Sequence, residues 1–68
     1  MQVINGMLAK KLQEIVDLQT EIELQEKIYT SLLEVGESIE IINEILLKIK
    51  YLKVELKAKE DHAMTLFN

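Results

Sequence analysis

The chain has 68 residues, a formal charge of −4 at pH 7, no Cys, no Pro and a single His. It is therefore one domain at most, and disulfides and a Cys-based zinc site are excluded. Leu, Ile, Glu and Lys dominate the composition, as is typical of long helices, and the acidic charge argues against a nucleic-acid partner.

The chain carries no sign of export or of a membrane span. Residues 1–8 contain no Lys or Arg before an apolar run, so we expect no secretory signal. The most apolar stretch, residues 39–47, is much shorter than the roughly 20 apolar residues of a spanning helix. We expect a cytoplasmic protein. The alternative, that residues 39–59 lie on a membrane surface, is opposed by the acidic residues of that segment.

A first helix is predicted over about residues 6–35, with Asn5 as its N-cap. Two lines of residues at seven-residue spacing run along it: Leu8, Ile15, Ile22 and Tyr29 form the a line, and Lys11, Leu18, Gln25 and Leu32 form the d line. These lines are the a and d positions of a heptad pattern, which is typical of helices that pack along a seam.

A turn is predicted at about residues 35–38, because the heptad lines of the two halves are out of phase by one residue. Gly36 suits the left-handed position just past a helix end, and Ser38 can accept a backbone N–H as the N-cap of the next helix. Ser31 with Glu34 forms a rival capping box, which would place the turn earlier.

A second helix is predicted over about residues 38–66. Its a line is Ile42, Ile49, Leu56 and Ala63, and its d line is Ile45, Leu52, Lys59 and Leu66. Folding the chain at the turn sets a against d in eight layers: Leu8/Leu66, Lys11/Ala63, Ile15/Lys59, Leu18/Leu56, Ile22/Leu52, Gln25/Ile49, Tyr29/Ile45 and Leu32/Ile42. Five of the eight layers are apolar on both sides. The sequence thus predicts an all-α antiparallel two-helix hairpin, coiled-coil-like, as a single domain over residues 1–68.

Charge supports the same register at coarse resolution. Residues 14–26 carry five acidic and no basic residues, and they face the lysines of residues 48–59. Glu21 would lie near Glu55, however, and a single exposed pair contributes only about 0–1 kcal/mol. The prediction therefore depends on the apolar layers.

Three polar residues occupy seam positions. A buried Lys can be catalytic when its pKa is lowered, but Lys11 and Lys59 lie near the open end of the hairpin, where long side chains reach water. A polar residue at such a position can fix register or oligomeric state. We hypothesise that Gln25 does so by pairing with its symmetry copy.

A second apolar stripe runs along the second helix, facing away from the seam, at Leu47, Tyr51, Val54 and Ala58; Leu46 and Ile41 widen the apolar arc beside the seam. A lone hairpin of this size buries too little apolar surface to be stable. We therefore expect a homo-oligomer, most simply a homodimeric four-helix bundle with the second helix inside. The alternatives are a different homo-oligomer and a hairpin that docks on an unidentified protein partner.

The expected function is that of a small non-enzymatic module that acts through protein–protein contacts and oligomerisation. No catalytic, cofactor-binding or metal-binding signature is found. His62, beside Glu60 and Asp61, has no second His at helical spacing, and seam layers of Leu and Ile offer no pocket of converging polar groups.

The alternative function is RNA or DNA binding through the lysines of the second helix, Lys48, Lys50, Lys53 and Lys57. These lysines would hold phosphates while Tyr51 stacks on a base. The absence of Arg argues against this reading, because Arg supplies the bidentate contacts that phosphate and guanine most often receive.

Overall fold

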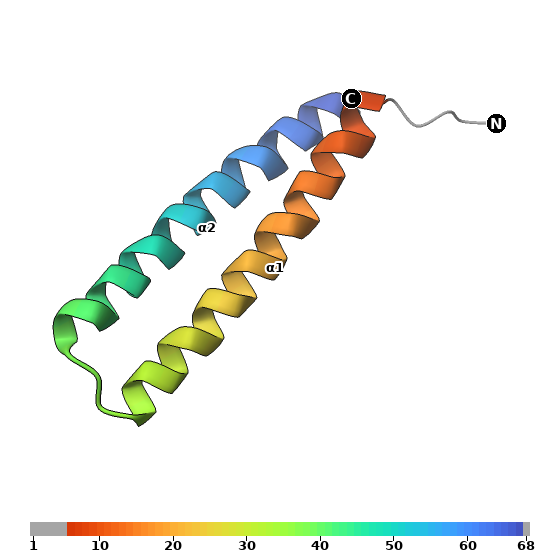
Figure 1. Ribbon diagram of the computed structural model, residues 1–68. Helices are drawn as coiled ribbons and strands as arrows, with labels where there is room; N and C mark the ends of the chain where they lie inside the picture. The colour runs from red at the N-terminus through yellow and green to blue at the C-terminus, as the bar shows by residue number, and fades with distance from the viewer. Residues whose placement is uncertain (1–5, 68) are drawn as a thin grey trace.

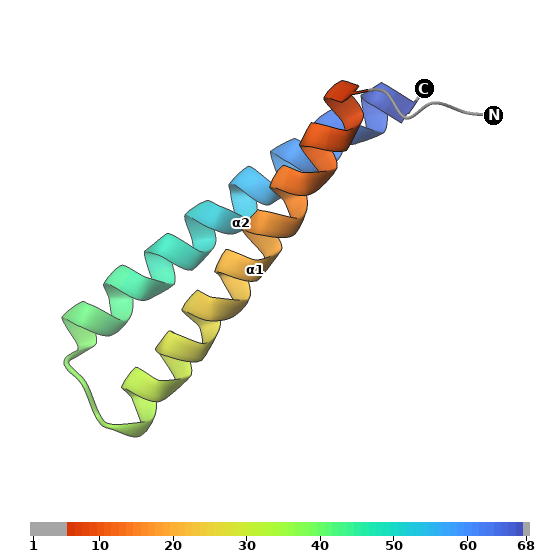
Figure 2. The same cartoon turned by 45° about the vertical axis from the view of Figure 1, so that its right-hand side comes forward.

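The computed structural model describes residues 6–67, which form two helices of 29 residues each, α1 (Gly6–Glu34) and α2 (Ile39–Phe67). The helices pack side by side as an antiparallel hairpin, with Gly6 and Phe67 at the same end and the connection at the other (Figures 1 and 2). Their bounds lie within one residue of the predicted 6–35 and 38–66. Asn5, the predicted N-cap of the first helix, lies outside the described residues.

α1 ends in a Schellman motif. The Glu37 backbone N–H donates to the Leu32 carbonyl at 3.0 Å, and the Gly36 N–H donates to the Leu33 carbonyl at 3.2 Å. These are the two hydrogen bonds that define the motif. Gly36 has a φ of 71°, in the left-handed region that glycine reaches without the Cβ clash of other residues. The predicted role of Gly36 is confirmed.

α2 begins at an N-cap provided by Ser38. The Ser38 hydroxyl oxygen accepts the Ile41 N–H at 3.4 Å, and the Ser38 carbonyl accepts the Ile42 N–H at 3.1 Å, the first bond of the helix. The Glu37 carboxylate accepts the Ser38 N–H at 3.1 Å. The rival capping box over residues 31–34 is wrong, because α1 continues through these residues.

The seam contains the residues that the heptad pattern predicts. Within residues 6–67, the buried and half-buried positions are the sixteen predicted a and d residues together with Glu14 and Glu21. The buried members are Leu8, Ile22, Gln25, Ile49 and Ala63. Both predicted seam faces are therefore confirmed.

The hairpin is thin. Its Cα atoms span 54 × 17 × 11 Å, which is a single helix deep. No large side chain in the described part of the chain is fully enclosed, since each seam residue is covered by one neighbouring helix only. Neither α1 nor α2 has an apolar stretch of the length that crossing a bilayer requires.

Candidate interaction surface

The apolar stripe predicted on the second helix lies on the side of α2 opposite the seam. Leu47, Tyr51 and Val54 are 63%, 79% and 68% exposed, and Ala58 is also exposed. With 3.6 residues per turn these four share one helix face, which we call the outer stripe. Large apolar side chains this exposed on successive turns of one face indicate a contact surface, because a scattered exposed Leu would need no explanation.

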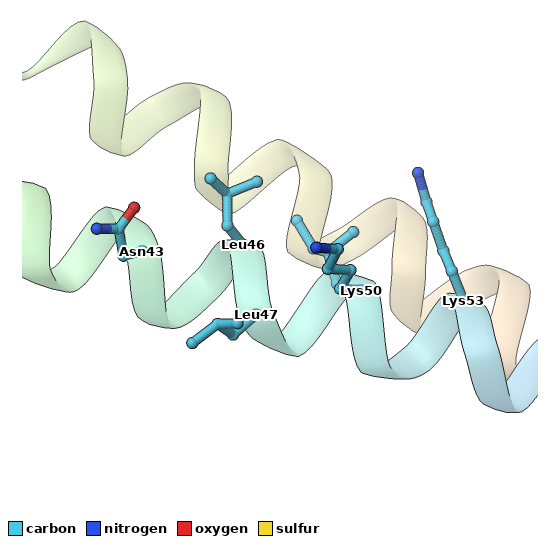
Figure 3. A pocket seen from close by; sticks show the side chains of 6 residues that line it. Asn43, Leu46, Leu47, Lys50 and Lys53 are labelled. Carbon is cyan, nitrogen blue, oxygen red and sulfur yellow. The ribbon is translucent and has the colours of Figure 1, made fainter.

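Two of the six predicted interface residues lie beside the seam and not on the outer stripe, as their spacing predicts. Leu46 and Ile41 are each 41% exposed and border the seam on its two flanks, so they belong to the edges of the hairpin core as much as to an outer contact. Figure 3 shows the difference between neighbours, since Leu46 points toward α1 and Leu47 points away from it.

Shallow grooves run between the protruding side chains of the outer stripe. One is lined by Leu47, Lys50, Tyr51 and Val54. A second groove, on the flank of α2, is lined by Asn43, Leu46, Leu47, Ile49, Lys50 and Lys53 (Figure 3). Leu47 and Lys50 border both grooves. Alternating ridges and grooves of this kind are what a second helix needs for its own side chains to interdigitate.

The outward face of α1 offers a weaker apolar surface. Val16 and Leu24 are 52% and 51% exposed. The residues around them on this face are polar or charged and exposed: Gln13, Thr20, Glu23 and Lys27. The more continuous apolar surface therefore belongs to α2.

The four lysines of the alternative prediction do not form one uncompensated basic face. Lys53 Nζ lies 3.5 Å from Glu26 Oε2 of α1, and Lys57 Nζ lies 3.4 Å from Asp61 Oδ1. Helical geometry places Lys48 on one flank of the outer stripe, and Lys50 and Lys57 on the other. Neither Lys48 nor Lys50 forms an ion pair with a described residue. Lys48, Lys50 and Lys57 therefore flank the outer stripe, whereas Lys53 reaches toward α1.

A charged cluster near the open end links the two helices, and it was not predicted. Lys59 Nζ donates to Glu14 Oε2 at 3.0 Å, and Lys11 Nζ lies 3.2 Å from the same oxygen. The Lys59 and Lys11 hydrogen bonds lower the pKa of the Glu14 carboxyl. The side chains of Lys59 and Lys11 are 26% and 20% exposed, so both are half-buried at the seam, and both ammonium groups lie beside Glu14.

Two features of the sequence could have indicated this cluster. Glu14 follows Lys11 by three residues, which places both on one side of α1. Glu14 also directly precedes Ile15, whose predicted layer partner is Lys59. The pairs Lys59–Glu14 and Lys53–Glu26 are the ion pairs that join α1 to α2 within residues 6–67, so the coarse charge prediction holds at two places.

Gln25 is the buried polar residue of the seam, at 6% exposure. Its Nε2 donates to Glu21 Oε1 at 3.1 Å, one turn earlier in α1. Its buried Oε1 has no hydrogen-bond partner among the described residues. A buried acceptor without a partner is destabilising. The bond from Gln25 to its symmetry copy stays a prediction.

His62 is exposed on α2, where its backbone carbonyl accepts a hydrogen bond from the Thr65 hydroxyl at 2.6 Å. Between residues 6 and 67, no three His, Cys, Asp or Glu residues are grouped so that they could hold a metal ion. The surface feature that stands out chemically is therefore the outer stripe with the charges on its flanks.

The fold and this surface place the protein in the class of antiparallel helical hairpins that expose an apolar helix face. Comparison of the chain with protein-family models, with curated proteins and with solved structures finds no match.

Proposed function

We propose that the protein is a small non-enzymatic self-association module, in which the outer stripe of α2 packs against the same stripe of a second copy. Four helices then form one bundle, with the two α2 helices inside and the two α1 helices outside. The observation that carries this proposal is the exposure of Leu47, Tyr51 and Val54, each above 60%, on a helix face that points away from its own hairpin.

The size of the hairpin supports a second copy as the occupant of this face. A chain of 68 residues with one thin seam buries little apolar surface, and association is the usual remedy when disulfides and metals are absent. Covering the outer stripe removes apolar side chains from water at about 25 cal/mol per Å². Because both copies carry the stripe, a two-fold arrangement satisfies both at once.

The length of α2 favours pairing along most of the helix. Its 29 residues span about 44 Å, whereas the outer stripe runs only from Leu47 to Ala58. Specific interfaces bury roughly 1,200 Å² or more in total. A dimer contact of that size therefore has to include more of α2 than the outer stripe.

The proposal is tested by introducing charge at the centre of the outer stripe. In the double variant Leu47→Glu, Val54→Glu we expect loss of the dimer mass by light scattering and loss of helicity by circular dichroism, since unpaired buried carboxylates cost several kcal/mol. The matched control is Val16→Glu, Leu24→Glu, which makes the same change on the outward face of α1. The control should keep both mass and helicity.

The two double variants separate a specific interface from a general effect of added charge. Loss of mass in both would show that net charge governs association. A dimer that survives Leu47→Glu, Val54→Glu with unchanged helicity would show that the outer stripe is not the contact, and the proposed function would then be wrong.

A further inference from the structure

We infer that the two copies pair antiparallel through α2, with Leu47 facing Tyr51 of the second copy and Lys48 forming an ion pair with Glu55 of the second copy. This inference rests on the proposed self-association through the outer stripe, and it specifies the partner's direction and register. The direction and register follow the way in which the hairpin pairs its own two antiparallel helices.

The hairpin shows which charged positions meet across an antiparallel helix pair. In α1, Glu26 directly follows the seam residue Gln25, and in α2, Lys53 directly follows the seam residue Leu52. Lys53 Nζ and Glu26 Oε2 lie 3.5 Å apart, and Figure 3 shows Lys53 reaching toward α1. Helical side chains lean toward the N-terminus of their own helix. Two residues that each lie a little C-terminal to the level at which they would face each other therefore converge when the helices run in opposite directions.

The outer stripe repeats this pattern on α2 itself. Leu47 and Val54 stand in the positions that Gln25 and Leu52 hold in the seam, and they are directly followed by Lys48 and Glu55. When Leu47 faces Tyr51 of the second copy, Lys48 and Glu55 of the second copy stand in the same relation as Glu26 and Lys53. The two-fold axis repeats the ion pair on the other half of the interface.

A second ion pair follows from the cluster at the open end. Glu14 directly precedes Ile15, the layer partner of Lys59, and Lys59 Nζ lies 3.0 Å from Glu14 Oε2. In the inferred register Lys57 directly precedes Ala58, which faces Glu40 of the second copy. Lys57 therefore meets Glu40 of the second copy as Lys59 meets Glu14. Both side chains are exposed in the single hairpin, where Lys57 also forms an ion pair with Asp61.

Other ways of pairing the outer stripes bring like charges together. A parallel pair would stack Glu40 and Glu44 each on its own copy, at positions inside the contact. An antiparallel pair shifted by one heptad, with Leu47 facing Ala58, would set Glu44 opposite Asp61. Like charges directly opposite each other are destabilising. The inferred register also sets Lys48 and Lys50 near their own copies and Glu44 near Glu55 of the second copy. Within α2, however, no two like charges stand directly opposite each other at interior positions, and each of the two unlike pairs occurs twice.

The test uses two single variants, each of which reverses one charge of the inferred ion pair between Lys48 and Glu55, alone and in a mixture. Lys48→Glu alone places two carboxylates opposite each other on both sides of the axis, and Glu55→Lys alone does the same with two ammonium groups. Each variant should dimerise about tenfold more weakly than the unaltered protein in sedimentation equilibrium at low salt. An equimolar mixture should recover the original affinity through the heterodimer. In it the introduced carboxylate faces the introduced ammonium group, and the native Lys48 faces the native Glu55. In about 1 M salt the differences should disappear.

The control is Lys27→Glu, which reverses an exposed lysine on α1 and should leave the dimer unchanged. Circular dichroism of every sample separates weaker association from loss of folding. If the unaltered protein dimerises and both α2 variants dimerise as strongly, or if the mixture does not recover, the inferred register is wrong while self-association stands. An unaltered protein that is a monomer overturns the proposed function, and the register with it.

Discussion

At position 36 the backbone conformation, and not a side-chain contact, favours glycine. Its φ of 71° closes α1 with a Schellman motif, and an added Cβ would meet no atom within 4 Å. The cost of Gly36→Ala is therefore the left-handed strain alone, and we expect a loss of about 1 kcal/mol in the free energy of unfolding by urea titration.

Gly6→Ala is the matched control for this change. Gly6 begins α1, an added Cβ there also has open space, and its φ is not positive. Because Ala favours helix over Gly, this variant should gain up to about 1 kcal/mol. Equal effects of the two substitutions would contradict the assignment of the strain to Gly36.

Gln25 is a residue whose polar group works against the stability of the single hairpin. Its buried Oε1 lacks a partner in the described structure, and its amide replaces apolar volume in the seam. We expect Gln25→Leu to raise the free energy of unfolding by about 1 kcal/mol, as measured by thermal unfolding at fixed protein concentration. A change in mass by sedimentation would instead support the hypothesis that Gln25 bonds its symmetry copy and fixes the oligomeric state, which requires an assembly in which the two α1 helices meet.

At the scale of the elements, Glu14 joins α1 to α2 through Lys59. The Lys59 and Lys11 hydrogen bonds hold the pKa of Glu14 below its usual value of 4.5. The ionised carboxylate therefore stabilises the folded state at pH values above 4.5, and this stabilisation is lost as the pH falls through the lowered pKa.

The matching experiment compares the unaltered protein with Glu14→Gln in urea titrations from pH 7 downward. The variant should be less stable at neutral pH, and the two proteins should converge at acidic pH, once Glu14 is protonated in the folded state too. A difference that stays constant over the whole range would show that Glu14 acts through packing and not through its charge.

Most of the element-level structure could be predicted from residue spacing. The a and d lines predicted all sixteen half-buried or buried seam residues, because a helix has a fixed period and one apolar face must be covered. The turn followed from Gly36 and Ser38, whose backbone and hydroxyl chemistry suits a helix end and a helix start.

What spacing could not predict is the conformation of long charged side chains. The heptad pattern places Lys11 and Lys59 at the seam, but it does not show that both ammonium groups meet at Glu14. Leu46 and Ile41, by contrast, border the seam as their spacing predicts. How far a neighbouring helix covers such flanking side chains depends on the angle between the helices, which spacing along the chain does not give.

The hairpin as a whole is a rod with one thin seam and an apolar outer stripe along α2. Its α1 side is polar, whereas its α2 side exposes Leu47, Tyr51 and Val54. In the proposed dimer a second copy covers the α2 side and leaves the α1 side in water. Folding and association would then be coupled, and stability would depend on protein concentration.

Self-association through the outer stripe is tested most directly by sedimentation equilibrium of the unaltered protein at low micromolar concentration. We expect a species of twice the chain mass of 7.9 kDa, with helicity that falls on dilution together with the mass. A single species of 7.9 kDa that keeps its helicity on dilution would contradict self-association, and would show that the hairpin folds without a second copy on its outer stripe.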